Sequence, residues 1–271
     1  MNRNTSLIKR GLVLVLAVLL FSITTAGADE VEDLAKQAQN PVSNLISLPF
    51  QNNTNFNVGP GDDVQNVLNI QPVVPFSVNE NWNLITRTIV PLIYQPEVIP
   101  GYGSEFGLGD INATFFMSPA KPGRVIWGVG PVISFPTASD RVLGAEKWSA
   151  GPSAVALTMQ GHWVVGALAN NLWSFAGDDD RPSVNQFLFQ YFINYNLPDG
   201  WYVTSAPIIT ANLKAESGNK WTVPFGGGAG RLIRIGRLPV NLSAQAYYNV
   251  ESPEQGPDWT LRLQLQMLFP K

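Results

Sequence analysis

The sequence predicts an all-β protein, an antiparallel transmembrane up-and-down β-barrel of about 12 strands with a short N-terminal helical lead-in. Runs of about 10 to 14 residues alternate between apolar and polar side chains, and short and long connectors alternate between these runs. The charged residues gather in the connectors. A soluble β-sandwich is the alternative, but its strands usually have about five or six residues and its outer face should be polar.

The first 28 residues have the pattern of a secretory signal peptide. The basic stretch MNRNTSLIKR is followed by the apolar stretch GLVLVLAVLLFSITTA, and Ala26-Gly27-Ala28 fits a small-residue cleavage site. An uncleaved membrane anchor is the alternative, although the apolar stretch is near the short end for a spanning helix. We therefore expect residues 1–28 to direct export and to be cleaved near Ala28.

The composition of the remaining chain excludes several classes of protein. The whole chain has 17 Lys and Arg against 20 Asp and Glu, and removal of the three basic residues of the signal peptide leaves a net charge of −6. Such a chain, without a basic patch, is not expected to bind nucleic acid. It contains no cysteine, which excludes disulfides and thiolate metal sites. Although 45% of the residues are hydrophobic and 14% charged, no second apolar run is long enough for a membrane helix.

The stretch DEVEDLAKQAQN over residues 29–40 is the one convincing helical segment, and it ends before Pro41. We interpret residues 29–46 as a periplasmic lead-in. Residues 47–271 then form the outer-membrane β-barrel.

Alternation is clearest in SVNQFLFQYFINYNL, residues 183–197, where Phe, Tyr and Ile occupy one face and Gln and Asn the other. The C-terminal run WTLRLQLQMLF repeats this pattern with Leu and Met against Thr, Arg and Gln. The expected strands cover residues 47–58, 66–78, 82–94, 107–117, 125–137, 148–159, 163–174, 183–197, 201–213, 221–233, 240–250 and 259–269.

The connectors predict which end of the barrel faces which side of the membrane. The short ones are residues 79–81, 118–124, 160–162, 198–200 and 236–239. The longer ones are residues 59–63, 95–106, 138–147, 176–182, 215–220 and 251–258. Together with Lys214, which adjoins the fifth of them, they carry 13 acidic and five basic residues. Outer-membrane barrels have short periplasmic turns and longer extracellular loops. With an even number of strands, both ends of the barrel domain are expected in the periplasm.

Aromatic residues at the ends of the runs predict two girdles at the membrane surfaces. Trp259 and Phe269 stand ten residues apart on the apolar face of the last run. At about 3.3 Å per residue and with the strand tilted, this separation spans an apolar band of about 25 Å. The candidate girdle residues are Trp82, Trp148, Trp201, Trp221, Trp259 and Phe269.

Four segments resemble a known family of outer-membrane proteins: GLGDINATFFMSP (107–119), GVGPVISFPTAS (128–139), KWSAGPSAVAL (147–157) and WTVPFGGGAGRLI (221–233). The resemblance, over residues 40–271, is to the MetA-pathway-of-phenol-degradation family, whose members are often labelled "transporter" or "neuromedin U". It implies passage of aromatic compounds across the outer membrane but assigns no substrate to particular residues. The chain departs from the common outer-membrane pattern because Phe269 is followed by Pro270 and Lys271.

Candidate pore-lining residues come from the polar faces of the runs. Arg262 shares its face with Thr260, Gln264 and Gln266, which makes it the best-supported lumen charge. Arg87 lies in an otherwise apolar run, where facing lipid would cost about 2–4 kcal/mol. The full candidate set is Arg87, Asp110, Gln190, Arg262, Gln264 and Gln266. These charges could select solutes, or could form a network that plugs the barrel.

Catalytic and metal chemistry have little support. The sole histidine, His162, lies in a short turn, whereas a membrane phospholipase needs a Ser–His pair with an orienting third group. The stretch GGGAG is not followed by the Lys-Ser/Thr of a phosphate loop. Asp178, Asp179 and Asp180 are weak candidates for a divalent cation, and a solvated acidic loop is the simpler interpretation.

The predicted function is therefore a channel or transporter for small solutes in the bacterial outer membrane, with hydrophobic or aromatic compounds as candidate solutes. A non-conducting barrel with a structural or surface-contact role is the alternative, and an outer-membrane hydrolase is a remote one. The expected partners are outer-membrane lipid and a small-molecule solute, with no cofactor. The sequence does not determine the oligomeric state.

Overall fold

The computed structural model describes residues 28–99 and 101–270. Apart from Ala28, the predicted signal peptide lies outside the described residues. Within them, no helix has both the length and the apolar character needed to cross a membrane.

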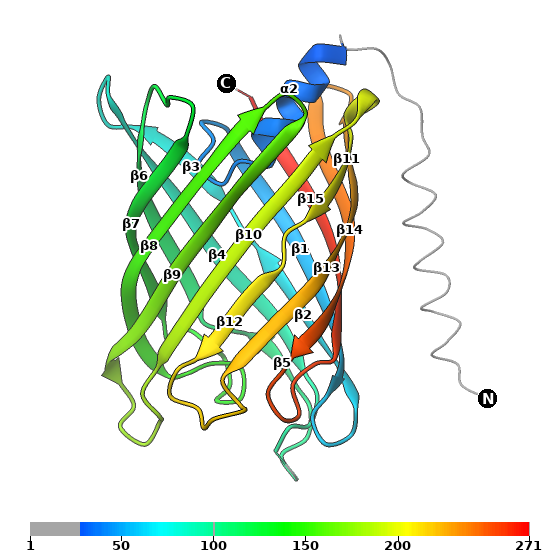
Figure 1. Ribbon diagram of the computed structural model, residues 1–271. Helices are drawn as coiled ribbons and strands as arrows, with labels where there is room; N and C mark the ends of the chain where they lie inside the picture. Colours follow the sequence, from blue (N-terminus) through cyan, green and yellow to red (C-terminus); the bar gives the residue numbers. More distant parts are fainter. Residues whose placement is uncertain (1–27, 100, 271) are drawn as a thin grey trace, which may run out of the picture.

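The strands form one antiparallel sheet that closes on itself (Figure 1). They are β1 (Ile46–Val58), β2 (Asp63–Ile70), β3 (Val73–Ser77), β4 (Trp82–Gln95), β5 (Glu105–Leu108), β6 (Ile111–Pro119), β7 (Ile126–Phe135), β8 (Lys147–Gln160), β9 (Trp163–Gly177), β10 (Asn185–Asn196), β11 (Trp201–Ser205), β12 (Ile208–Asn212), β13 (Trp221–Ile235), β14 (Leu238–Glu251) and β15 (Trp259–Phe269). Closure comes from β1 and β15, which pair from Ile46↔Phe269 to Phe56↔Trp259.

Three of the barrel strands are interrupted, so the 15 strands of the sheet make a barrel of 12. β2 and β3 both pair with β1 and β4, β5 and β6 both pair with β4, and β11 and β12 both pair with β10 and β13. The first and last breaks fall at Pro72 and Pro207, which have no N–H for the ladder. The remaining break falls at Gly109-Asp110. The 12-strand antiparallel barrel is confirmed, but unbroken strands over 66–78, 107–117 and 201–213 were wrong.

The two ends of the barrel differ as the connectors predicted (Figure 1). One end, here called the turn end, carries the short connectors, the C terminus and the helix α2 (Ala28–Ala38). The turn between β10 and β11 is the short 3-10 helix η1 (Pro198–Gly200). The opposite end, here called the loop end, carries the longer connectors.

Alternate side chains point into and out of the barrel. Along β15, Arg262 and Gln266 are buried inward, whereas Trp259, Leu265 and Phe269 are exposed. Along β14, the inward side chains from Asn241 to Asn249 are buried, and the outward Tyr248 is 62% exposed. A strand places successive side chains on opposite faces, so its period-two sequence defines a lumen face and an outer face.

The inward face has two unlike sectors. The apolar sector is the buried cluster Val73, Ile85, Phe116, Val155, Leu157, Val164, Leu168 and Phe192, carried by β3, β4, β6, β8, β9 and β10. The polar sector consists of inward side chains of β1, β14 and β15: Gln51, Asn53, Asn55, Asn241, Ser243, Gln245, Arg262, Gln264 and Gln266. The lumen is therefore filled on one side and polar on the other.

The chain between α2 and β1, residues 39–45, lies inside the turn end. Val42 is 5% exposed and completes the apolar sector. On the other side, Leu34, Ala35 and Leu45 pack against Leu232 of β13 and Leu268 of β15. The amphipathic helix thus buries its apolar face against the inner rim of the barrel, and the predicted lead-in occupies the turn end.

Aromatic side chains gather on the outer face at both ends. At the loop end Trp259 stacks on Phe56 with ring centroids 4.4 Å apart, and Trp148 packs on Phe135 at 5.4 Å. At the turn end Trp82 packs edge-on against Trp127 at 5.8 Å. The other candidates, Trp201, Trp221 and Phe269, also stand at strand ends.

Candidate functional site: the polar lumen

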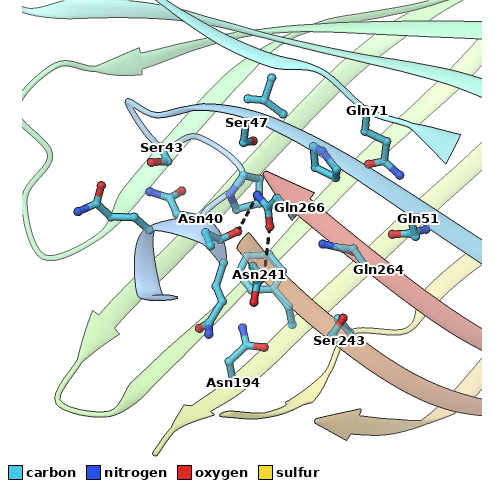
Figure 2. Close-up of a pocket in the computed structure, with 18 of the residues that line it drawn as sticks. Asn40, Ser43, Ser47, Gln51, Gln71, Asn194, Asn241, Ser243, Gln264 and Gln266 are labelled. Atoms are coloured by element: carbon cyan, nitrogen blue, oxygen red, sulfur yellow. Dashed lines mark hydrogen bonds between the residues drawn. The ribbon is translucent and has the colours of Figure 1, made fainter. Parts of the chain in front are cut away.

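A polar chamber lies just inside the turn end (Figure 2). Its volume is about 160 Å³, and it is bounded by residues 37–45 and by the inward faces of the strands. Figure 2 shows Asn40 and Ser43 of the N-terminal segment beside Asn241 and Gln266 of β14 and β15. The Gln266 amide donates to the Ala38 carbonyl at 3.3 Å, so the polar sector binds the end of α2.

One charged side chain lines this turn-end chamber, that of Arg87 on β4. Its guanidinium donates to the Gln71 side-chain oxygen at 2.8 Å. The cross-strand neighbour of Arg87 is Val73, a member of the apolar sector. Arg87 therefore stands where the polar and apolar sectors meet.

Arg262 divides the lumen further toward the loop end. Its Nε donates to Asn53 Oδ1 at 2.9 Å, and its Nη1 donates to the Ala206 carbonyl at 2.8 Å. The guanidinium carbon lies 4.9 Å from the centre of the Tyr247 ring. The Tyr247 hydroxyl in turn accepts from the Ala206 N–H at 3.0 Å. We call Arg262, Tyr247 and Ala206 the partition.

The partition depends on the break between β11 and β12. Because Pro207 offers no N–H, the ladder is interrupted and the backbone of Ala206 becomes available to side chains in the lumen. Its carbonyl also accepts from Gln190 Nε2 at 3.3 Å. The partition joins β15 and β14 to the break between β11 and β12, which lies on the opposite side of β13. An interruption of one strand thus narrows the lumen.

Two further cavities lie on the loop side of the partition. One, of about 240 Å³, is lined by Asn53, Asn55, Thr222, Asn249 and Thr260 together with Tyr247 and Arg262. The other, of about 400 Å³, lies under the connector after β9 and is lined by polar residues including Asn112, Ser149 and Gln186. Polar cavities therefore occur on both sides of the partition.

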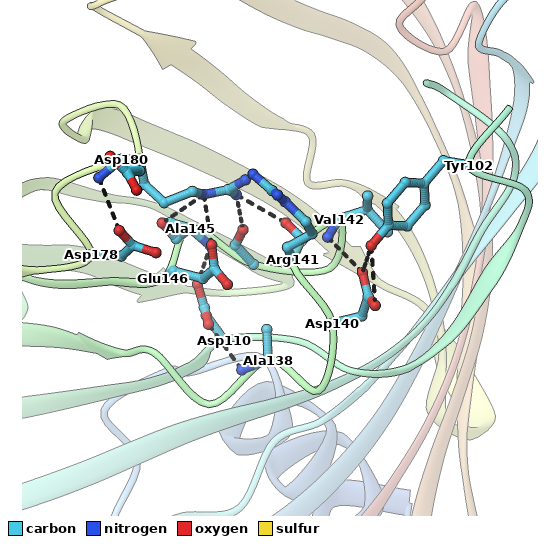
Figure 3. A network of polar contacts seen from close by, with 12 residues as sticks. Tyr102, Asp110, Ala138, Asp140, Arg141, Val142, Ala145, Glu146, Asp178 and Asp180 are labelled. Atoms are coloured by element: carbon cyan, nitrogen blue, oxygen red, sulfur yellow. Dashed lines mark hydrogen bonds and ion pairs between the residues drawn. The ribbon is translucent and has the colours of Figure 1, made fainter. Parts of the chain in front are cut away.

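The loop end is partly covered by two connectors that bind each other (Figure 3). Arg181 donates to the carbonyls of Arg141 and Gly144 at 2.9 and 2.6 Å, and its Nε lies 3.1 Å from Glu146. Asp110 accepts from the backbone N–H groups of Ala138 and Ala145 at 3.1 and 2.7 Å. Asp110 was predicted to line the pore, and in the structure both of its carboxylate oxygens accept hydrogen bonds from this connector.

The other predicted pore-lining residues lie inside the barrel. Arg87, Gln190, Gln264 and Gln266 line the turn-end chamber, and Arg262 lines the adjoining cavity. Sequence reasoning missed Tyr247, although an aromatic residue on the polar face of a run was a detectable signal. It also missed Ala206 and Val42, which carry no local signal of a lumen position.

His162 lies in the turn between β8 and β9, where its Nδ1 is 3.2 Å from Glu32 of α2. Glu32 is also 2.9 Å from Lys36, and the hydrogen bond from Lys36 is the main cause of a lowered pKa for its carboxyl group. His162 thus contacts the lead-in helix and has no nucleophile paired with it among the described residues.

The Asp178–Asp180 stretch forms a local turn, in which Asp178 Oδ1 accepts from the Asp180 N–H at 2.9 Å. The described residues bring together no group of three or more His, Cys, Asp or Glu side chains able to hold a metal ion. The weak metal candidates therefore gain no support from the geometry.

Comparison with known proteins supports the fold. No family model matches the chain, and no curated protein matches it. The solved COG4313 outer-membrane channel from Pseudomonas putida F1 matches with a TM-score of 0.62 and 17% identity, over 83% of this chain and 93% of that chain. The fold is therefore that of an outer-membrane β-barrel, while membership of the family predicted from the sequence stays a prediction.

Two weaker likenesses carry no argument about function. The outer-membrane phospholipase dimer with bound calcium from Salmonella typhi has a TM-score of 0.43 and 13% identity, over 91% of this chain and 99% of that chain. The CymD monoaromatic hydrocarbon channel has a TM-score of 0.45 and 9% identity, over 93% and 95%.

Proposed function

We propose that this protein is a channel for small solutes in the bacterial outer membrane, with its turn end in the periplasm and its loop end at the cell surface. The observation that carries the proposal is the polar sector, with its cavities on both sides of the partition. A barrel needing only stability could fill its lumen with apolar side chains, as the apolar sector does. A row of polar side chains facing internal space is what a water-filled path requires.

The solutes are small because the lumen is already narrowed by residues 39–45, the apolar sector and the partition. A barrel of 12 strands lies between eight-stranded barrels filled by side chains and porins with 16 or more strands. Aromatic or otherwise hydrophobic solutes are the favoured class by the sequence resemblance, and the solved structure of the same fold is itself described as an outer-membrane channel. In this orientation the aromatic residues of the outer face form girdles at the two membrane surfaces.

A non-conducting barrel is the second candidate, and specific contacts favour it. Val42 is buried in the apolar sector inside the turn end, and Arg262 is hydrogen-bonded past β14 and β13 to the Ala206 carbonyl. If neither contact opens, the protein would serve the envelope as a closed barrel. A hydrolase finds no comparable support, since His162 is engaged with the lead-in helix.

Conductance of the refolded protein in planar bilayers tests the proposal, with Arg262→Glu as the informative variant. The wild type should conduct, and Arg262→Glu should shift the reversal potential in a salt gradient toward cation selectivity. A charge in a narrow pore acts where screening by water and salt is weak. Arg124→Glu is the matched control, because Arg124 lies exposed in the turn between β6 and β7.

Folding of each variant is checked by the heat-modifiable shift on a gel. A folded Arg262→Glu barrel with unchanged selectivity would remove Arg262 from the conducting path. A folded wild-type barrel without any conductance would make the non-conducting barrel the better account.

A further inference from the structure

We infer that the lumen binds small organic carboxylates, with Arg87 in the turn-end chamber and Arg262 in the partition as two successive binding groups. As a transport route this inference rests on the proposed channel function, whereas the binding sites themselves can be tested without it. The inference comes from the charges that line the cavities, the partners of those charges, and the apolar wall beside one of them.

All the charged residues that line the three lumen cavities are arginines, and there is one in each: Arg87, Arg262 and Arg181. No Asp or Glu is among these lining residues. Arg181 is paired with Glu146. Asp110, which the sequence predicts to face the lumen, accepts hydrogen bonds from the backbone of the connector between β7 and β8. The unpaired charges that line these cavities, those of Arg87 and Arg262, therefore favour anions locally.

Arg87 and Arg262 are held by neutral groups. Within the described residues, no carboxylate lies within salt-bridge distance of either guanidinium. Arg87 has the Gln71 amide oxygen as its side-chain partner, and Arg262, only 6% exposed, has Asn53 and the Ala206 carbonyl. A guanidinium has five N–H donors, so each of these arginines retains donors for a further acceptor.

Removing a cation from bulk water without a counter-charge is costly, and an anion from the solute pool would reduce that cost. The planar guanidinium matches a carboxylate through two parallel hydrogen bonds, which chloride cannot form. At Arg262, an incoming carboxylate would replace the Ala206 carbonyl as an acceptor. This exchange would release one of the two hydrogen bonds that hold Ala206 in the partition and leave the Ala206–Tyr247 bond, so the preferred solute would loosen the partition.

The surroundings of Arg87 add a second property to the ligand. Val73 is its cross-strand neighbour, and Leu168 and Phe192 of the apolar sector also line the turn-end chamber. A carboxylate bound to Arg87 would therefore place its other end against an apolar wall. Benzoate-like anions, with one carboxylate and one small apolar group, fit both sectors better than a purely polar dicarboxylate does.

Binding of 4-fluorobenzoate to the detergent-solubilised full barrel, measured by fluorine NMR relaxation, tests the sites directly. The neutral isostere 4-fluorobenzamide serves as the matched ligand. We expect benzoate to bind the wild type at least about tenfold more tightly than benzamide, since charge-assisted hydrogen bonds dominate the difference. The double variant Arg87→Gln/Arg262→Gln, which removes both binding groups, should reduce benzoate affinity at least about tenfold and leave benzamide binding nearly unchanged.

Arg262→Lys and Arg262→Gln separate charge from geometry. In bilayers that conduct, Arg262→Lys should stay anion-selective but lose the preference for benzoate over chloride, because lysine has no planar fork. Arg262→Gln should lose both properties. Arg124→Gln, with the same change at an exposed turn position, should behave as the wild type.

The outcomes distinguish this inference from the channel proposal. Benzoate binding that depends on Arg87, in a barrel without conductance, would support the site and reject the channel. Conductance in the absence of any benzoate preference, or equal binding of benzoate and benzamide, would overturn the carboxylate inference and leave the channel standing. Wild-type benzoate affinity in the folded double variant Arg87→Gln/Arg262→Gln would equally overturn it.

Discussion

The apolar and polar sectors line the same lumen but differ in how their side chains are stabilised. In the apolar sector, side chains such as Phe116 and Val164 are fully buried and pack on Val42. In the polar sector, Asn241 accepts from Tyr202 at 2.9 Å and donates to Gln266 at 3.3 Å. The apolar sector removes surface from water, whereas the polar sector keeps donors and acceptors satisfied beside internal space. Under the proposed channel function, stability and permeation would therefore depend on different strands of the same barrel.

The largest expected effect comes from breaking the apolar sector. Phe116→Ala should lower the free energy of unfolding by about 3–5 kcal/mol, because it leaves a cavity where the ring is 0% exposed. Gln264→Ala in the polar sector should cost less than about 1 kcal/mol, since water in the adjoining chamber can replace the amide. Urea unfolding of the refolded barrel in detergent or lipid measures both. Equal losses in the two variants would mean that the sectors do not differ in their contribution to stability.

An intermediate effect, on conductance, is expected when residues 39–45 are displaced from the turn end. Val42→Asp places an unpaired carboxylate in the apolar sector, which should expel residues 39–45 from the turn end. Single-channel conductance should then rise severalfold while the barrel still shows its heat-modifiable gel shift. Val42→Ile is the matched control and should leave conductance unchanged. Unchanged conductance in folded Val42→Asp would show that residues 39–45 do not limit the path.

The smallest expected effect concerns the pH dependence of α2. The Lys36 hydrogen bond, with a smaller contribution from His162, lowers the pKa of Glu32 in the docked helix. A carboxyl group with a lowered pKa stabilises the docked state fully above its ordinary pKa of about 4.3, and this contribution is lost as pH falls through the lowered value. The protection factors of the α2 amides, which correct for the slower intrinsic exchange in acid, should thus fall as pH is lowered in the wild type. Glu32→Gln should show lower protection at neutral pH and a smaller fall in acid, by an amount typical of exposed ion pairs, about 0.2–1 kcal/mol.

The barrel could be predicted from sequence because alternation of polarity is strict where one face is polar. The sequence segments that form β10, β14 and β15 have this property. The lengths of the connectors predicted which end of the barrel carries short turns and which carries long loops. The breaks at Pro72 and Pro207 were readable in principle, because proline removes a ladder donor. The apolar sector could not be predicted from sequence. Strand β8 places valine and leucine inward and alanine outward, and when both faces of a strand are apolar, alternation of polarity cannot show which face points inward.

The site was predicted in part for a related reason. Arg262, Gln264 and Gln266 stood on a regular polar row, so their common face followed from spacing alone. The partners of Asp110 could not be predicted, because they are backbone N–H groups of a connector about 30 residues away, which no local pattern reveals. The partition needed a three-dimensional contact between Arg262 and a backbone carbonyl 56 residues distant in sequence.

The position of residues 39–45 has a consequence for how the barrel is assembled. The seam between β1 and β15 joins segments more than 200 residues apart, so it can form only after the other strands are in place. The segment that immediately precedes β1 lies within the finished cylinder. When the seam closes, that segment has to be inside already or has to enter through the turn-end mouth. Biogenesis must therefore coordinate two events at one strand, lateral closure of the wall and insertion of the chain that leads into it.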